Sequence, residues 1–263
     1  MKKILLFISI AFVFQSCFKE PITGRRQVNL LPESTMIGMS VTSYRDFLTK
    51  NPATAATDAQ AQMVKNVGSK ISAAVTRFLK QKNLSNRVDG YKWEFNLVND
   101  PTVNAWCMPG GKVVVYSGLL PVTQDETSLA VVMGHEIAHA IARHGNERMS
   151  QGLIVQLGGL GLQVAMSQKP QETQNIFLQS YGVASTLGTL KYSRVHESEA
   201  DKMGLVFMAM AGYDPSAAVP FWERMAKTGG QKPLEILSTH PSDATRIKDI
   251  KAFLPQALKY YKK

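Results

Sequence analysis

Cysteine is scarce in this sequence of 263 residues, which contains only Cys17 and Cys107. Two cysteines exclude the disulfide-dense frameworks that stabilise many small exported domains. Cys107 lies within an apolar run, and we expect it to be a small buried hydrophobic residue. Charged residues make up 19% and hydrophobic residues 44% of the chain, which is the composition of a globular protein and not of a disordered one.

Acidic residues are also in short supply. The 20 Asp and Glu residues are outnumbered by 30 Lys and Arg residues, which gives a formal net charge of +10. A basic surface suits anionic lipid headgroups or acidic polymers, although many such surfaces are simply solvated. The sequence has neither an aromatic-plus-basic RNA motif nor a helix-turn-helix signature, so we expect no nucleic-acid partner.

Beyond its N-terminus, the chain lacks an uninterrupted apolar run long enough to span a bilayer. The stretch from Gly152 to Met166 is apolar but contains Gln156, Gln163 and four glycines. We expect a helix that packs through small residues, with a membrane span as the alternative.

The N-terminus resembles a bacterial lipoprotein signal. A basic "MKK" and the apolar "ILLFISIAFVF" precede "QSC", in which Cys17 would become the lipidated first residue of the mature chain. We therefore predict a signal peptide over residues 1–16, a lipidated tether over 17–32 and one domain over 33–263. Phe14 and Gln15 depart from the usual pattern, so an ordinary cleaved signal and an uncleaved anchor are alternatives. The expected location is the cell envelope, on a membrane surface that faces the periplasm.

Residue periodicity predicts a mainly α-helical α+β fold. Helical spacing of apolar residues covers about 33–51 and 55–82, and strand-like alternation covers 91–100. Two further short strands flank Pro109-Gly110-Gly111, and we expect a small antiparallel sheet. From about Asp125 onward the pattern is helical, with Gly145 and Asn146 predicted to end the first of these helices.

The segment "HEIAHAIARHG" contains three of the five histidines in the chain. Residues four apart share one face of a helix, so His135 and His139 converge, whereas His144 is turned away by about 140°. Glu136 lies beside their meeting point. This H-E-x-x-H pattern supplies two imidazoles for one zinc ion and a carboxylate that can take a proton from zinc-activated water.

A catalytic zinc needs a third protein ligand, and "YSRVHESEADKMG" is the best source. Glu197 and Asp201 share one helix face, so Glu197 can reach the metal while Asp201 accepts the N–H of a ligand histidine. Glu199 points away from that face. His196 is the alternative third ligand.

Four motifs carry a resemblance to a known family: "VNAWCMPGGKVVVYSGLL", "HEIAHAIARHGNER", "SRVHESEAD" and "STHPSDATRI". In this order they resemble the HtpX/BepA/Oma-type zinc metallopeptidases of peptidase family M48, over most of the chain from about residue 23 to 247. The resemblance implies a zincin-like domain with the small sheet beside the active-site helix.

The same resemblance assigns roles to individual residues. It implies that one zinc per chain is held by His135, His139 and Glu197, with Glu136 as the general base. It also implies that peptide substrate pairs with the backbone near Asn104 and Ala105. The further residues that it brings to the site are Asp201, which orients a ligand, Arg246 and Arg194 around it, and His240, which either stabilises the oxyanion or caps the resting zinc.

The function expected from these residues is zinc-dependent endopeptidase activity on extended or unfolded polypeptides of the cell envelope, as part of protein quality control. One alternative is a zinc-containing lipoprotein that binds misfolded envelope proteins without cutting them. Another is a structural zinc site with His240 as its fourth ligand. Residues 152–175, which separate the two metal-binding segments, are predicted to form either a lid over the cleft or a packing helix.

Overall fold

The computed structural model describes residues 17–157, 167, 170–181, 193–228, 236, 240 and 244–262. The predicted signal peptide, residues 1–16, lies outside them. The elements in chain order are β1 (Cys17–Lys19), β2 (Arg26–Val28), α2 (Glu33–Lys50), α3 (Ala59–Gln81), η1 (Ser85–Val88), β3 (Glu94–Val98), β4 (Ala105–Met108), β5 (Lys112–Tyr116), η2 (Ser117–Leu119), α4 (Leu120–Thr123), α5 (Glu126–Ile141), α6 (His144–Leu157), α8 (Pro170–Ser180), α9 (Arg194–Met210), η3 (Pro215–Ala217), α10 (Ala218–Thr228), α12 (Ala244–Ala257) and η4 (Leu258–Tyr260).

Local sequence signals account for the starts of the long helices. The side chains of Asp58, Asp125 and Ser193 precede α3, α5 and α9, and each accepts a hydrogen bond from a backbone N–H group in the first turn. Helix α2 ends at Lys50, one residue before Asn51, where the predicted helical spacing ended. The described part of the chain is therefore mainly helical, as the periodicity predicted.

The three-stranded sheet has a mixed topology and not the wholly antiparallel one expected. Strands β4 and β5 form the predicted antiparallel hairpin. The strand order is β3-β5-β4, so β3 pairs with β5 and runs parallel to it. The alternation of apolar residues predicts the strands but not their order, because β5 inserts between its two predecessors.

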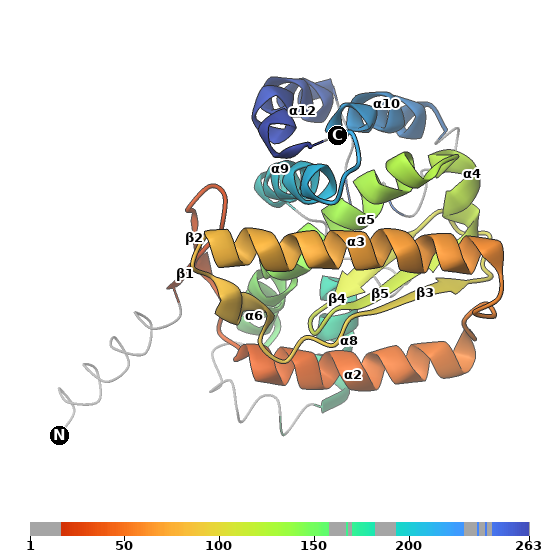
Figure 1. The fold of residues 1–263 in the computed structure, drawn as a ribbon. Coiled ribbons are helices and arrows are strands. Elements are labelled where there is room, and N and C mark those ends of the chain that lie inside the picture. The colour runs from red at the N-terminus through yellow and green to blue at the C-terminus, as the bar shows by residue number, and fades with distance from the viewer. Residues whose placement is uncertain are drawn as a thin grey trace.

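Both faces of this sheet are buried. Helices α3 and α5 cover one face, where Val113 and Val115 join the larger core. Helices α2 and α8 lie on the other face, where Trp106 and Val114 join a second core. Figure 1 shows the sheet between α3 and α2. Burial on both sides explains why β5 is an almost continuous apolar run.

Helix α5 packs closely against α9, and this contact positions the site. The helices meet at Gly134 and Gly204, where a Cβ carbon on Gly134 would lie 3.0 Å from the carbonyl oxygen of Gly204. Without side chains at these two positions, the backbones can approach more closely than larger residues allow. The histidines of α5 are therefore brought directly beside the acidic residues of α9.

The predicted end of the first C-terminal helix was wrong. Helix α5 stops at Ile141, Arg143 adopts a positive φ of 61°, and a new helix begins at His144. Helix α5 therefore ends before Gly145, the residue predicted to end it. Side-chain sterics disfavour a positive φ in residues other than glycine. An arginine in the sequence therefore does not indicate that a helix ends there.

The N-terminal segment lies on the domain. Strands β1 and β2 form an antiparallel hairpin, and β2 contacts α6. Gln27, Asn29 and Leu31 are buried there. Residues 17–32 are thus packed against the helices over much of their length, although their sequence shows no clear periodicity.

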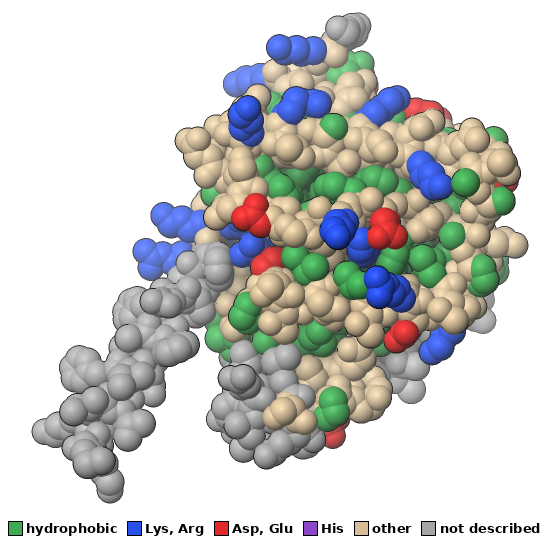
Figure 2. Space-filling view, turned by 60° about the horizontal axis from the view of Figure 1, so that its bottom comes forward, with side chains coloured by type: hydrophobic (Ala, Val, Ile, Leu, Met, Phe, Trp, Pro, Cys, Tyr) green, Lys and Arg blue, Asp and Glu red, His purple; other side chains and the backbone are tan. Residues whose placement is uncertain are grey.

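No helix in the described ranges is long and apolar enough to cross a bilayer. Of the apolar stretch, α6 covers the part up to Leu157. Residues 158–166 lie outside the description, as do parts of the predicted lid. The described face in Figure 2 carries scattered Lys and Arg side chains, in keeping with the net charge of +10.

Candidate active site

His135 and His139 lie one turn apart on α5, and both side chains are buried. Their Nε2 atoms are 3.0 Å apart, so the two rings converge as the four-residue spacing predicted. Burial lowers the pKa of His139 well below its usual range, which keeps the ring neutral at neutral pH. A neutral imidazole is the form that binds a metal.

Glu197 on α9 and His240 complete a cluster of four donor groups with these histidines. Glu197 Oε1 lies 3.0 Å from His240 Nδ1 and 3.4 Å from His139 Nε2. His240 Nδ1 lies 3.2 Å from His135 Nε2. All four side chains are buried, and their donor atoms lie within 4.8 Å of one another.

The cluster fits a tetrahedral zinc ion. Zinc bonds of about 2.0–2.2 Å to nitrogen and oxygen in a tetrahedron would place neighbouring donor atoms about 3.3 Å apart. Four of the separations between these groups, 3.0–3.4 Å, agree with that spacing. Burial and Arg246 lower the pKa of His135, but Glu197 and Asp201 outweigh them and raise it to about 9. The site therefore favours positive charge, which a bound cation would supply.

Glu136 lies beside the cluster on α5. Its carboxyl group is buried, and its Oε1 atom makes no hydrogen bond within the described residues. His240 Nε2 is 3.5 Å from this oxygen. Burial raises the pKa of Glu136, which favours proton transfer near neutral pH. A buried carboxylate oxygen without a partner is costly, so the arrangement indicates that the oxygen meets a ligand or water in the working protein.

Asp201 and Arg246 hold His135 from behind. Asp201 Oδ1 accepts from His135 Nδ1 at 2.9 Å, and Arg246 donates to both oxygens of Asp201 at 2.8 Å. Arg246 also lies 3.0 Å from Glu197 Oε2 and 3.5 Å from the centre of the Trp222 ring. Burial opposes charge on Asp201, but Arg246 and His135 outweigh it and keep the pKa of Asp201 below its usual value.

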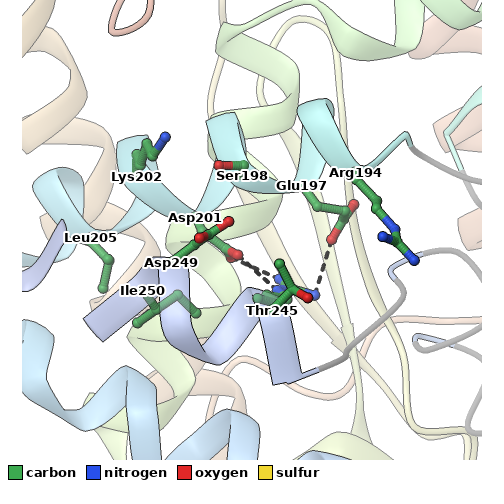
Figure 3. A pocket seen from close by; sticks show the side chains of 10 residues that line it. Arg194, Glu197, Ser198, Asp201, Lys202, Leu205, Thr245, Asp249 and Ile250 are labelled. Carbon is green, nitrogen blue, oxygen red and sulfur yellow. Dashed lines mark hydrogen bonds and ion pairs between the residues drawn. The ribbon is translucent and has the colours of Figure 1, made fainter. Parts of the chain in front are cut away.

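A pocket opens between α9 and α12 beside the cluster. Arg246 forms part of its wall, with its ion pairs to Glu197 and Asp201. Arg194 lies at the Glu197 end, whereas Leu205 lies at the opposite end (Figure 3). The structure thus places Arg194 at the pocket, and its role at the site stays a prediction.

His196, the alternative third ligand, lies outside the four-donor cluster. Its Nε2 atom is 3.0 Å from Glu147 Oε2, and its ring stacks on that of His144 at a centroid distance of 4.5 Å. The sequence missed the role of His144, whose Nδ1 atom lies 2.9 Å from Nδ1 of His139. Burial lowers the pKa of His144 to about 4, so this ring is neutral. The early end of α5 brings it back to the site.

Strand β4 lies at an edge of the sheet. The carbonyl of Asn104 accepts from the N–H of Tyr116 at 3.1 Å, so Asn104 turns this group toward β5. Because hydrogen-bonded and non-hydrogen-bonded positions alternate in an antiparallel pair, Ala105 and Cys107 direct their backbone groups to the outer edge. Of the two expected substrate-binding residues, Ala105 thus directs its carbonyl to the outer edge, whereas its N–H group donates to the side chain of Asn104 at 2.9 Å.

Comparison with known proteins agrees with this geometry. Residues 65–254 match Peptidase family M48. The chain is 40% identical to the mitochondrial metalloendopeptidase OMA1 of Schizosaccharomyces pombe over 185 residues, which cover 70% of this chain and 53% of that protein. It is 30% identical to the human metalloendopeptidase OMA1 over 264 residues, which cover 97% of this chain and 49% of that protein.

A bacterial relative is also found. The putative beta-barrel assembly-enhancing protease of Vibrio cholerae is 35% identical over 164 residues, which cover 59% of this chain and 33% of that protein. The chain spans about half the length of the two OMA1 proteins. The protein belongs to peptidase family M48, as its motifs indicated, and is a member of a metallopeptidase family.

Proposed function

We propose that this chain is a zinc-dependent endopeptidase that hydrolyses peptide bonds in extended or unfolded polypeptides. The observation that carries the proposal is the buried group of His135, His139, Glu197 and His240, with Glu136 beside it, whose Oε1 atom makes no hydrogen bond within the described residues. Three of these donors suffice for a catalytic zinc. The family assignment and the metalloendopeptidase relatives support the same activity.

The zinc, when bound, supplies Lewis acidity to the scissile carbonyl and makes a water molecule acidic enough to lose a proton near neutral pH. Glu136 takes that proton on its free Oε1 atom and passes it to the leaving amine. Asp201 fixes the Nδ1–H tautomer of His135, which leaves Nε2 for the metal. Arg246 holds Asp201 in place through two hydrogen bonds.

The outer edge of β4 is the proposed substrate-binding surface. An extended peptide added to this edge would pair with the carbonyl of Ala105 and the backbone of Cys107, whatever its side chains. This mode suits a protease that acts on many unfolded sequences. Asn104 contributes by holding the strand, because its carbonyl bonds to β5 and its side chain accepts from the Ala105 N–H group.

His240 is proposed to cap the metal in a resting state. Its Nδ1 atom lies among the donor atoms of the other three groups, in the position that water and substrate would need. A closed site of four protein ligands is typical of structural zinc, and this feature favours a non-hydrolytic zinc site as the second candidate. For hydrolysis, a capping His240 must leave the cluster; the alternative role of His240 is to donate to the oxyanion of the reaction intermediate.

The proposed location is the cell envelope. Cys17 is the proposed lipidation site that anchors the chain to a membrane surface facing the periplasm, after removal of a signal peptide. The bacterial relatives named beta-barrel assembly-enhancing proteases support a role on envelope proteins. Mass spectrometry of the membrane-extracted chain tests the anchor: an acylated N-terminal Cys17 is expected, and an unmodified N-terminus would overturn it.

The activity is tested with the wild type and Glu136→Gln, which removes the base but keeps all four donors. We expect one zinc per chain in both proteins and cleavage of casein by the wild type alone. Equal cleavage by both proteins would remove Glu136 from the mechanism. Zinc without cleavage in either protein would point to an enzyme capped by His240 or to the non-cleaving lipoprotein that binds misfolded envelope proteins, and cleavage by His240→Ala would distinguish the two.

A further inference from the structure

The second metal-binding histidine has a support of its own. His139 uses Nε2 toward the four-donor cluster, and its Nδ1 atom lies 2.9 Å from Nδ1 of His144. His144 Nε2 lies 3.0 Å from Glu199 Oε2. All three side chains are at most 2% exposed. This arrangement forms a continuous hydrogen-bonded series that leads away from the cluster.

The donor and the acceptor of each hydrogen bond follow from the carboxylate of Glu199 at the end of the series. A carboxylate can only accept, so His144 must donate through Nε2 to Glu199. A neutral imidazole carries one proton, so Nδ1 of His144 must accept from the Nδ1–H group of His139. That tautomer of His139 leaves Nε2 unprotonated, which is the form that binds a metal.

The series ends in the N-terminal segment. Arg25 donates from Nε to Glu199 Oε1 at 2.8 Å and from Nη2 to Glu199 Oε2 at 3.0 Å, and Thr23 donates to Oε1 at 2.8 Å. Arg25 also forms two hydrogen bonds with Glu147, of 2.8 and 2.9 Å. A single guanidinium therefore joins two carboxylates that lie on α6 and α9.

The two metal-binding histidines are thus supported in parallel ways. His135 is held by Asp201, which is held by Arg246 of α12. His139 is held by His144, then by Glu199 and Arg25. The difference is the origin of the arginine, because Arg25 precedes β2 in the segment before the helical domain.

We propose that His144, Glu199 and Arg25 are positioning residues for His139, so that metal binding depends on docking of the N-terminal segment. The proposal rests on the zinc site of the proposed function. In it, Arg25 fixes Glu199, Glu199 fixes the tautomer and ring of His144, and His144 fixes His139. A chain whose N-terminal segment is undocked would have a poorly oriented second ligand.

The test compares zinc affinity among variants of the full chain purified in detergent. Zinc dissociation constants are measured by competition with a chromophoric chelator, and the visible spectrum of the Co²⁺-substituted protein reports ligand geometry. Arg25→Ala and His144→Phe are expected to weaken zinc binding by about 10- to 100-fold, the usual effect of losing a partner of a ligand, and to alter the Co²⁺ spectrum. Arg26→Ala is the matched control, since Arg26 is the exposed neighbour with the same charge.

A merely structural role is distinguished by the stability of the metal-free protein. If Arg25→Ala weakens zinc binding and alters the Co²⁺ spectrum at temperatures well below the unfolding midpoint of its metal-free form, Arg25 acts on the site. Zinc binding lost only in proportion to the loss of folded protein would overturn the proposal. The double variant Arg25→Ala/Glu199→Gln is expected to have a zinc dissociation constant no higher than that of the more impaired single variant. Both changes break the same hydrogen-bonded series, so their effects should not add. His144→Phe could fail to fold, and Arg25→Ala keeps the test decisive because its side chain is partly exposed.

The outcomes separate the two proposals. Zinc dissociation constants within twofold of wild type for Arg25→Ala would overturn the positioning series alone. Normal zinc binding by wild type, weakened in the variants but without cleavage by any protein, His240→Ala included, would overturn the endopeptidase and keep the positioning series. A wild-type chain that binds no zinc would overturn both.

Discussion

The backbone nitrogen of His135 lies so close to Gly204 that a Cβ carbon at position 204 would be 2.9 Å from it. This approach brings α9, with its two acidic site residues, against the start of the H-E-x-x-H segment. The atom in the way is backbone, so it cannot rotate aside as a flexible side chain would. The close approach of α5 and α9 therefore depends on the absence of a side chain at Gly204.

Gly204→Ala is expected to push the two helices apart. Overpacking of this kind costs about 1–3 kcal/mol of unfolding free energy, and zinc binding should weaken because Glu197 moves from His135. Chemical denaturation and zinc titration measure the two effects. Gly38→Ala is the control, since no atom lies within 4 Å of its added Cβ carbon and it should be neutral or stabilising. Equal stability of both variants would contradict the expectation.

Asp201→Asn tests the support of His135. The amide keeps the size of the side chain but loses the charge that Arg246 and His135 bind. Zinc affinity is expected to fall by about 10- to 100-fold, as for other partners of metal ligands. Asp249 lines the same pocket, and Asp249→Asn serves as the control. An unchanged zinc dissociation constant in Asp201→Asn would show that the carboxylate does not orient the ligand.

His240→Ala distinguishes a cap from an oxyanion donor. We expect the variant to retain one zinc through His135, His139 and Glu197, and to cleave casein faster than wild type, because the fourth position is open. The measurement is the initial rate at saturating zinc. A loss of rate of about 100-fold with zinc still bound would instead assign His240 to the oxyanion.

Glu147 should make stability sensitive to acid. Burial opposes its charge, but hydrogen bonds from Arg25 and His196 outweigh burial and lower its pKa to about 2. The unfolded value is about 4.3, so its contribution is complete above about pH 5 and is lost as the pH falls toward 2. We estimate about 1–2 kcal/mol, reduced for solvent screening.

Urea denaturation of wild type and Glu147→Gln between pH 7 and pH 3 checks this estimate. The difference in unfolding free energy should be largest at neutral pH and shrink as the pH decreases, because the Glu147 carboxylate of the unfolded chain is then protonated while that of the folded chain is still ionised. A difference that stays constant with pH would show that the ionised form of Glu147 contributes nothing to stability.

Local patterns predicted the parts of the site that lie close together in sequence. The four-residue spacings of His135 with His139 and of Glu197 with Asp201 fix two faces, and helix geometry alone makes each pair converge. The family resemblance added His240, which periodicity could not supply. The donor atoms of these groups meet in the structure as that combination requires.

The parts that were missed depend on the backbone conformation of one residue or on distant contacts. His144 is five residues from His139 and would point elsewhere on a continuous helix, but Arg143 turns the chain first. Arg25 lies 122 residues from Glu147 and 174 from Glu199. No local periodicity relates positions so far apart. The strand order of the sheet could not be predicted for the same reason.

The packed N-terminal hairpin would limit where a chain anchored by lipid at Cys17 can act. Strand β1 begins at Cys17, and Cys17 pairs with Val28 of β2. If Cys17 carries the proposed lipid, hardly any slack chain separates the bilayer from the folded body. The cleft would then be held at a nearly fixed, small height above the membrane, and only polypeptides that emerge from or lie along that surface would come within its reach.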